Sequence, residues 1–308
     1  MDDAFTYYKK SGEILAKTFE LIESIVKPGI PLLDIAEKAE NFIRKNSAIP
    51  AFPVNISINE VAAHYSPIIN DDSVIPEKSI VKIDAGACVN GYLSDAARTF
   101  IFDDKWQKMK DVARKALDKA ISIVKPDLSV FQIGEIVQDT IESEGFQPIV
   151  NLSGHSLAHY SLHDGISIPN YRVSRRIRDM SHKFEIGKAY AIEPFVTTGI
   201  GRVNDGKEET IFRQFRKSKT KNMSPKIQEI YEYMNENFHR LPFSWRWVYN
   251  AGFSIEDIEK TNMRLFNDHV IHGYPILIEA TRSPVTQAEE TIFVGKDRVH
   301  VTTKSRKM

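Results

Sequence analysis

The sequence predicts an α+β fold of two similar halves, each with a pair of helices outside a curved antiparallel sheet. Three observations predict it. Apolar residues recur at helical spacing in two pairs of segments, the second pair repeats residues of the first, and strand-like runs follow each pair. A charged, helix-rich stretch interrupts this pattern. We therefore expect residues 1–204 and 273–308 to form one domain, with residues 205–272 inserted as a helical subdomain.

Two helices are expected near the N-terminus, separated by Pro28 and Gly29, residues that commonly lie between elements. In both segments apolar residues recur every three or four positions, as they do on the buried face of an amphipathic helix. These positions are Leu15, Phe19, Ile22 and Val26 in the first segment and Leu32, Ile35, Ala36, Ala39, Phe42 and Ile43 in the second.

Strand-like runs follow at residues 80–83 and 92–101, on either side of Asn90 and Gly91. An Asn-Gly pair between two such runs is a strong signal for a hairpin with a two-residue turn. The sequence therefore predicts an antiparallel strand pair here.

The two-helix pattern then starts again between residues 106 and 141. Residues 24–28 and 122–126 share the sequence Ser-Ile-Val-Lys-Pro, at an offset of 98 residues. At the same offset lie four further identical pairs: Ile35 and Ile133, Glu37 and Glu135, Ile43 and Ile141, and Pro50 and Pro148. Matches that keep one register indicate an internal duplication.

Each half also has a strand-like run that ends in a carboxylate. Residues 78–84 end at Asp84 and residues 187–193 end at Glu193, so two facing halves would bring both acids to a central cleft. Around the predicted turn, Asp95 comes within two residues of the position that faces Asp84. A buried carboxylate needs a partner, for which a metal ion is suited, although two exposed strand acids are an alternative for this pair.

Three of the nine histidines, His155, His159 and His163, fall within nine residues. Their spacing of four places them on one side of either a helix or a strand, and histidines in a polar loop are the alternative. Glu193 and Glu289 each lie in strand-like sequence, which by itself does not identify a site.

The order of these residues resembles the pita-bread metallopeptidases, and more narrowly a type 2 methionine aminopeptidase of compact, archaeal-like form that starts at its first helix. The resemblance covers nearly the whole chain, including the helical insertion that type 1 enzymes lack. Its motifs are Phe52-Pro53, Ala62-Ala63-His64-Tyr65-Ser66-Pro67, Asn151-Leu152-Ser153-Gly154-His155-Ser156, Tyr190-Ala191-Ile192-Glu193-Pro194-Phe195 and Glu289-Glu290-Thr291-Ile292. It implies a pita-bread fold and removal of the initiator methionine from nascent proteins whose second residue is small.

The resemblance implies five metal ligands, Asp84, Asp95, His155, Glu193 and Glu289, with none replaced. Asp95 and Glu289 would bridge two ions, Asp84 would bind one of them, and His155 and Glu193 would complete the other. Four carboxylates and one imidazole suit divalent Co, Mn, Fe or Zn. Two such ions can lower the pKa of a shared water enough for it to attack a carbonyl at neutral pH.

The resemblance also implies that His64 and His163 are catalytic, by hydrogen-bonding the scissile amide and stabilising the tetrahedral intermediate. His159 is expected to be structural or to line the pocket. Four further residues would form an apolar slot for the methionine side chain: Phe52, Leu162, Phe195 and Tyr274. Each of these four, taken alone, could equally belong to the core.

Composition limits the partners. The 41 basic and 41 acidic residues balance, which gives no field that favours DNA, other nucleic acid or a membrane. Cys88 is the single cysteine, so an intramolecular disulfide is excluded and a reducing compartment fits. We see no signal peptide or long apolar run and expect a soluble, cytoplasmic monomer that acts on nascent polypeptide N-termini, with the ribosome as a further candidate partner.

Two alternatives stay open: a peptidase for Xaa-Pro substrates, and a non-catalytic relative that binds RNA or ribosomes. The basic residues at the start of the insertion could contact ribosomal RNA, or simply form a solvated loop. They are Arg213, Arg216, Lys217, Lys219 and Lys221.

Overall fold

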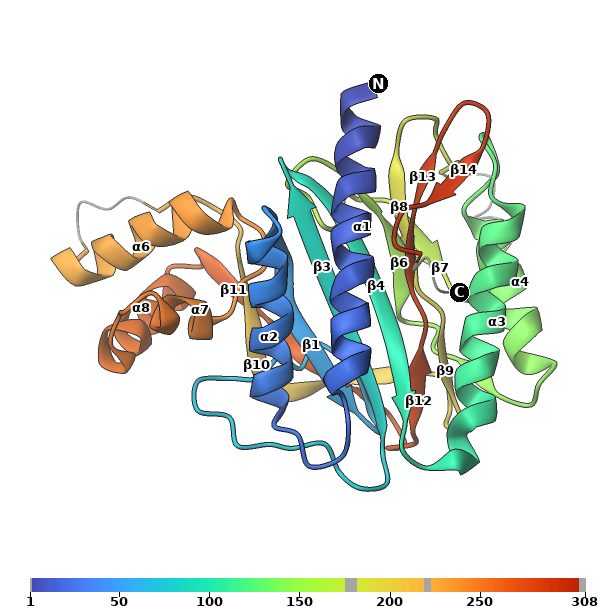
Figure 1. Ribbon diagram of the computed structural model, residues 1–308, viewed down its shortest axis with the longest axis horizontal. Coiled ribbons are helices and arrows are strands. Elements are labelled where there is room, and N and C mark those ends of the chain that lie inside the picture. The colour runs from blue at the N-terminus through green and yellow to red at the C-terminus, as the bar shows by residue number, and fades with distance from the viewer. Residues whose placement is uncertain (1, 175–181, 219–222, 305–308) are drawn as a thin grey trace.

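Helices cover one face of a set of antiparallel sheets in the computed structural model, which describes residues 2–174, 182–218 and 223–304 (Figure 1). The predicted α+β class is confirmed, and the strand pairs are antiparallel throughout the part described. Within the described residues, no helix is both long and apolar enough to cross a membrane.

The first half consists of two helices over a three-stranded sheet of order β1-β3-β4. Its elements are α1 (Asp2–Ile25), α2 (Leu32–Lys45), β1 (Ile49–Ile58), β3 (Ile80–Val89) and β4 (Tyr92–Ile101), with the short β2 (Val61–Ala63) after β1. Eight of the ten apolar positions predicted to face the core are buried: Leu15, Phe19, Ile22, Leu32, Ile35, Ala36, Ala39 and Ile43. The other two, Val26 and Phe42, are partly buried, and Val26 follows the last residue of α1. The helical periodicity therefore identified the packed faces of both helices.

The predicted hairpin turn joins β3 and β4, whose last pair is Val89 with Tyr92. Asn90 and Gly91 both have positive φ, 49° and 84°, which is the backbone of the tight hairpin turns that Asn-Gly favours. A Cβ on Gly91 would also lie 2.3 Å from Nε2 of His159, so only glycine fits at this position.

The second half repeats the first. The helices α3 (Gln107–Ile123) and α4 (Phe131–Glu142) follow a short 3-10 turn, η1 (Asp104–Trp106), and have their own buried cluster. The strands are β5 (Gln147–Pro148), β6 (Ser153–Leu157), β7 (Ser167–Pro169), β8 (Ala189–Ile192), β9 (Phe195–Thr197), β12 (Val285–Gln287), β13 (Glu290–Val294) and β14 (Val299–Val301). The 98-residue offset that places Pro50 on Pro148 also places β1 on β5, as a duplication requires.

Three helices lie between two long paired strands, β10 (Val203–Gln214) and β11 (Ile271–Glu279). Within the described residues they are α6 (Pro225–Phe238), α7 (Trp245–Asn250) and α8 (Ile255–Asn267), which lie at the left of Figure 1. They share a separate apolar cluster. The first residues of the predicted insertion are thus strand, and the helical part begins at Pro225. The domain boundaries themselves stay a prediction.

The basic residues of the insertion are only partly described. Arg213 lies on β10, with Arg216 and Lys217 just after this strand, whereas Lys219 and Lys221 lie outside the described residues. The helices α1 to α4 occupy the outer face in Figure 1, which leaves the opposite face of the sheets for the site.

Candidate metal centre

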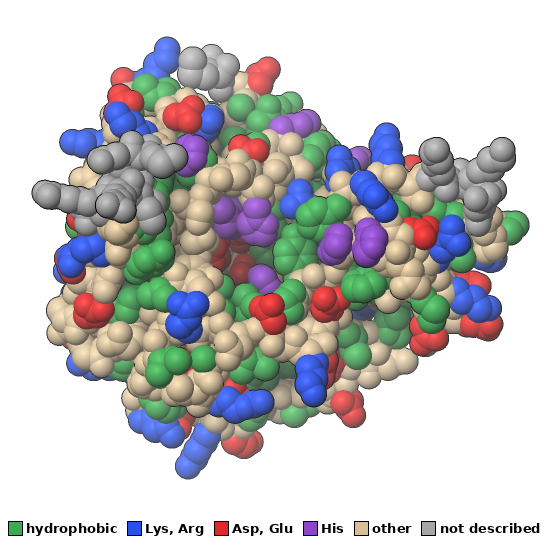
Figure 2. Space-filling model, turned by 180° about the vertical axis from the view of Figure 1, so that it is seen from behind, with side chains coloured by type: hydrophobic (Ala, Val, Ile, Leu, Met, Phe, Trp, Pro, Cys, Tyr) green, Lys and Arg blue, Asp and Glu red, His purple; other side chains and the backbone are tan. Residues whose placement is uncertain are grey.

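A cavity of about 380 Å³ opens on the face away from the helix pairs, where Figure 2 shows acidic side chains at the bottom of a hollow and histidines beside them. Both halves and the β10–β11 pair line it. All eleven residues predicted to bind metal, act in catalysis or form the methionine slot contribute to its wall: Phe52, His64, Asp84, Asp95, His155, Leu162, His163, Glu193, Phe195, Tyr274 and Glu289. The structure therefore brings the predicted residues together in one place.

The β3–β4 hairpin carries two of the carboxylates, Asp84 and Asp95. Asp84 on β3 pairs with Ala97, and Asp95 on β4 pairs with Gly86, so the two acids are offset by two positions across the ladder. Residues two apart on a strand point to the same face, so both carboxylates point into the cavity.

The second half delivers the other three groups. His155 on β6 pairs with Ala191 on β8, and Glu193 is the residue after β8 ends. Glu289 precedes β13 and forms a bridge with Ala97 of β4. That bridge joins the two halves directly beside the cavity.

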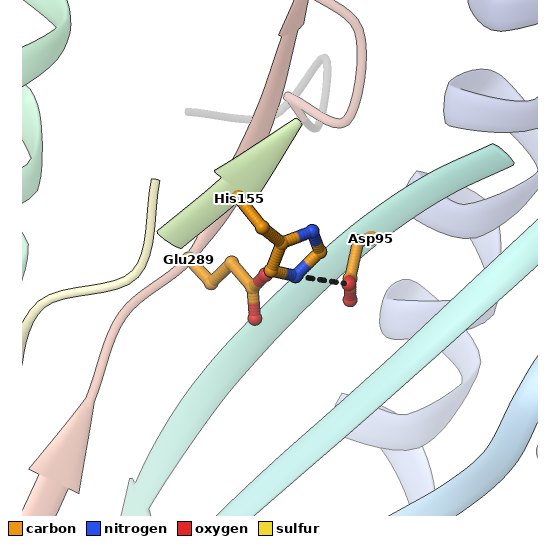
Figure 3. Close-up of side chains that lie close together, drawn as sticks. All are labelled: Asp95, His155 and Glu289. Atoms are coloured by element: carbon orange, nitrogen blue, oxygen red, sulfur yellow. Dashed lines mark ion pairs between the residues drawn. The ribbon is translucent and has the colours of Figure 1, made fainter. Parts of the chain in front are cut away.

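The donor atoms lie close to one another. His155 Nε2 is 3.6 Å from Asp95 Oδ2 and 3.7 Å from Glu193 Oε1. One ligand atom from each of Asp95, His155 and Glu289 can be chosen so that all three lie within 4.8 Å of one another, as Figure 3 illustrates. Asp95, His155 and Glu289 are buried, and Asp84 and Glu193 are partly exposed to the cavity.

Four acids this close together oppose one another's ionisation. Burial raises the pKa of Asp84 to about 7. Burial, followed by the charges of Asp84 and Glu193, raises the pKa of Asp95 well above its usual range, and Glu193 and Glu289 are raised in the same way. Burial lowers the pKa of His155 to about 4, so its imidazole is neutral at pH 7 and can act as a ligand.

Cationic side chains do not neutralise these acids. In the part of the chain that the structure describes, neither lysine nor arginine forms an ion pair with any of the four carboxylates. Lys82, two residues from Asp84, donates to the carbonyl of Asn59 instead. Oδ1 of Asp84 and Oδ1 of Asp95 are buried without a hydrogen-bond partner. Unpaired buried oxygens around a neutral imidazole fit divalent metal ions.

Two further histidines line the same cavity. His64 has a positive φ of 69°, which is uncommon for a residue with a side chain, and its Nδ1 lies 3.1 Å from the carbonyl of Pro275. Since a carbonyl only accepts, Nδ1 carries the proton and Nε2 of the neutral ring is an acceptor. The ring of His163 lies 4.5 Å from that of His155 and 6.4 Å from that of Tyr274.

The three clustered histidines do not share one face. β6 ends at Leu157 and the chain then turns, with a positive φ at Tyr160. His159 therefore points to the hairpin, where its Nε2 lies 3.0 Å from the carbonyl of Asn90. His159 therefore contacts the hairpin turn beside Gly91. It is not among the described residues that line the cavity.

The apolar wall comes from distant segments. Phe52, Leu162 and Phe195 are at most 6% exposed, and the ring of Tyr274 packs edge-on against that of His64 at 5.4 Å. The cavity is also lined by residues that the sequence did not predict, among them Asn55, Ile166, Ile211 and Pro242. Ile211 could have been found from its alternation within a strand pattern, whereas the position of Asn55 depends on a strand irregularity described below.

The chain is similar to known proteins in sequence and in fold. The sequence pattern of metallopeptidase family M24 matches residues 6–257. The methionine aminopeptidase of Saccharolobus solfataricus is 39% identical over 295 residues, which cover 96% of each chain. That of Methanocaldococcus jannaschii is 37% identical over 297 residues, covering 96% of this chain and 97% of the relative. The crystal structure of methionine aminopeptidase from Rickettsia prowazekii matches with a TM-score of 0.71 at 21% identity, covers 99% of this chain and 98% of its own, and shows the shared fold.

Proposed function

The chain belongs to metallopeptidase family M24, and on that basis we propose that it releases methionine from the N-terminus of peptides as a type 2 methionine aminopeptidase. The single observation that carries this proposal is the convergence of four unneutralised carboxylates and one neutral imidazole in a cavity with an apolar wall.

The proposed ligands are Asp84, Asp95, His155, Glu193 and Glu289. Asp95 on β4 and Glu289 before β13 come from the two segments that meet at the Ala97–Glu289 bridge, so both would hold metal at the junction of the halves. Asp84 would serve one ion, and His155 with Glu193 the other, consistent with the 3.6–3.7 Å separations around His155 Nε2. When bound, divalent Co, Mn, Fe or Zn ions would supply a water of lowered pKa and polarise the scissile carbonyl.

The histidines would act as neutral hydrogen-bonding groups. Burial lowers the pKa of His64, and burial with the nearby His155 lowers that of His163. Because Nδ1 of His64 donates to Pro275, its Nε2 is left to accept a hydrogen bond from the amide N–H of the substrate. His163, beside His155, would contact the same peptide group from the other side.

The apolar wall supports methionine as the first residue. Phe52, Leu162, Phe195 and Tyr274 offer aromatic and aliphatic surface that an unbranched thioether can fill. The ions on one side and this wall on the other would place the bond after the first residue at the reacting centre.

The three helices between β10 and β11 support the type 2 assignment, because an insertion at this place distinguishes the two types in the resemblance described above. We also infer that nascent chains with a small second residue are the substrates, that the protein acts in the cytoplasm as a monomer, and that any ribosome contact involves the basic residues near Arg213.

The test is methionine release from a peptide panel by purified, Mn²⁺-loaded protein. We expect cleavage of Met-Ala-Ser, little cleavage of Leu-Ala-Ser, none of Ala-Pro, and loss of activity with a chelator. Cleavage of Ala-Pro alone would identify a Xaa-Pro peptidase instead. A protein that binds no metal and cleaves nothing would be a non-catalytic relative.

A further inference from the structure

Asn55 lies in the cavity wall with an unused acceptor. Its side chain is 4% exposed, and Oδ1 is buried without a hydrogen-bond partner. We propose that Asn55 Oδ1 accepts a hydrogen bond from the α-amino group of the substrate's first residue and so selects for a free N-terminus. This specificity role rests on the proposed function, since it assumes an aminopeptidase substrate in the cavity.

The orientation of the amide is fixed by its neighbour. Nδ2 of Asn55 lies 2.9 Å from the carbonyl oxygen of Pro53, and a carbonyl can only accept. The NH₂ group therefore faces Pro53, and Oδ1 is the atom left over. A buried acceptor without a donor is costly, so a ligand that brings an N–H group to Oδ1 gains affinity.

A β-bulge in β1 orients the side chain of Asn55 toward the cavity. Phe52 pairs with Gly86 and Asn55 pairs with Asp84, so two residues of β1, Pro53 and Val54, face one residue of β3. In a regular strand Phe52 and Asn55 would point to opposite faces, because their spacing is odd. The bulge brings both into the cavity wall.

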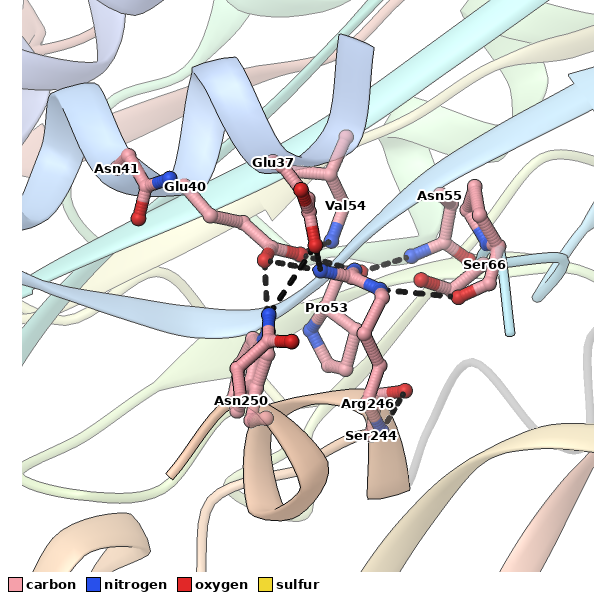
Figure 4. A network of polar contacts seen from close by, with 12 residues as sticks. Glu37, Glu40, Asn41, Pro53, Val54, Asn55, Ser66, Ser244, Arg246 and Asn250 are labelled. Carbon is pink, nitrogen blue, oxygen red and sulfur yellow. Dashed lines mark hydrogen bonds and ion pairs between the residues drawn. The ribbon is translucent and has the colours of Figure 1, made fainter. Parts of the chain in front are cut away.

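A buried ion pair between Glu40 and Arg246 stabilises the bulge (Figure 4). The N–H of Val54, which has no strand partner, donates to Oε1 of Glu40 at 3.2 Å. Glu40 in turn accepts two hydrogen bonds from the guanidinium of Arg246, at 2.8 and 2.9 Å, and one from the indole of Trp247 at 2.7 Å. Arg246 also donates to the carbonyl of Pro67. The inserted helix α7 thus fixes the strand that carries Asn55.

The α-amino group is the ligand that this position fits. Asn55 is the direct cross-strand partner of Asp84, so the two side chains lie next to each other on one face of the sheet. The amine of the first residue must lie near the metal ligands for the adjacent peptide bond to reach the reacting centre. An amide oxygen accepts from this amine without adding a fifth negative charge to the four carboxylates.

The test measures ligand affinity by calorimetry on the Mn²⁺-loaded protein. The two ligands are L-methionine and 4-(methylthio)butanoate, which is methionine with the amine replaced by hydrogen. Asn55→Leu and Asn55→Ala both remove the acceptor, and Asn55→Asp keeps it. Melting temperature and Mn²⁺ content are measured for every variant, and any variant that folds can be used in the comparison.

We expect Asn55→Leu or Asn55→Ala to weaken L-methionine about tenfold, the usual size for one such hydrogen bond, and to change 4-(methylthio)butanoate less than about twofold. Asn55→Asp should keep the preference for the amine. Equal weakening of both ligands, or loss of Mn²⁺ from the variants, would overturn the assignment. The proposed function fails separately, if the wild-type protein releases no methionine from Met-Ala-Ser.

Discussion

Glu289 and Glu290 are consecutive in the sequence, but their carboxylates lie on opposite sides of the chain in opposite electrostatic surroundings. Glu290 accepts from Arg98 and Arg114, each at 2.8 Å, and from the hydroxyl of Thr303. Glu289 faces the cavity among three other acids, where its pKa is raised by burial and by the charges of Asp95 and Asp84. One glutamate is neutralised by the protein, and the other requires a ligand.

This contrast predicts opposite effects of the same substitution on metal-free protein. Glu290→Gln leaves Arg98 without its charge partner and Arg114 with Asp118 alone, and should lower the free energy of unfolding by about 2 kcal/mol. This is less than for a fully buried pair, because Arg114 is 30% exposed. Glu289→Gln removes a charge from the acid cluster and should raise the unfolding free energy by about 1 kcal/mol. The melting temperatures of the two variants and of the wild type, measured after a chelator has removed bound metal, test both predictions.

Metal content supplies the control for this pair of variants. Glu289→Gln should lose Mn²⁺ and activity, whereas Glu290→Gln should keep both at temperatures where it is folded. If Glu289→Gln destabilised the metal-free protein as much as Glu290→Gln does, the cavity acids would not repel one another as the structure indicates.

Gly86 determines how close the Phe52 ring lies to β3. A Cβ at this position would lie 2.5 Å from Cε1 of Phe52, so alanine would force the ring away. Gly86→Ala should lower kcat/KM for methionine substrates about tenfold, the usual order for a misfitted apolar pocket, mostly through KM. In the double variant Gly86→Ala/Phe52→Leu the smaller side chain leaves room, so part of the loss should be recovered. No recovery would mean that the close approach of the added methyl to Cβ of Ala51, 2.8 Å away, causes the loss instead.

The Arg246–Glu40 pair predicts a difference between breaking and replacing a buried ion pair. Arg246→Met should lower the unfolding free energy by about 3 kcal/mol, because Glu40, 0% exposed, would lose its closest charge partner and keep only Arg44, 3.8 Å away. In Arg246→Met/Glu40→Gln the amide oxygen can still accept from either Val54 or Trp247, and the buried charge is gone, so part of the loss should be recovered. Denaturant unfolding measures both, and equal instability of the single and double variants would contradict the role of the charge.

Glu279 predicts a pH effect away from the cavity. Burial alone would raise its pKa, but hydrogen bonds from Thr281, Ser283 and Ile200 outweigh burial and lower it. A lowered folded-state pKa stabilises the protein above the ordinary glutamate pKa, and this contribution is lost as the pH falls through the folded value. Between pH 5 and 3 the melting temperature of Glu279→Gln should therefore fall less than that of the wild type. Parallel curves would show that Glu279 makes no such contribution.

The hairpin residues show what could be predicted from the sequence. Asn90-Gly91 fixes a two-residue turn, and turn geometry fixes register, so the offset of Asp84 and Asp95 follows from local sequence alone. The likeness of residues 78–84 to residues 187–193 similarly predicted that Glu193 and Asp84 lie at one cleft. Both predictions rest on sequence patterns that can be recognised without knowledge of the tertiary structure.

Other features depend on long-range packing that no local pattern encodes. The shared helical or strand face expected for the three histidines is wrong for His159, because β6 ends between His155 and His159. Asn55 reaches the cavity only through a bulge, and the pair that holds the bulge, Glu40 and Arg246, is separated by 206 residues. Such contacts are set by the packing of the insertion against α2 and β1.

The most direct test of the metal centre is the number of divalent ions bound per chain, measured by mass spectrometry on Mn²⁺-equilibrated, desalted protein. We expect about two ions per chain in the wild type. Asp95→Asn, which alters a proposed ligand, should fall well below one, while the neighbouring Ser94→Ala outside the cavity wall keeps both. The proposed metal centre would be contradicted if the wild type bound no Mn²⁺, Co²⁺, Fe²⁺ or Zn²⁺. It would also be contradicted if Asp95→Asn bound as many metal ions as the wild type.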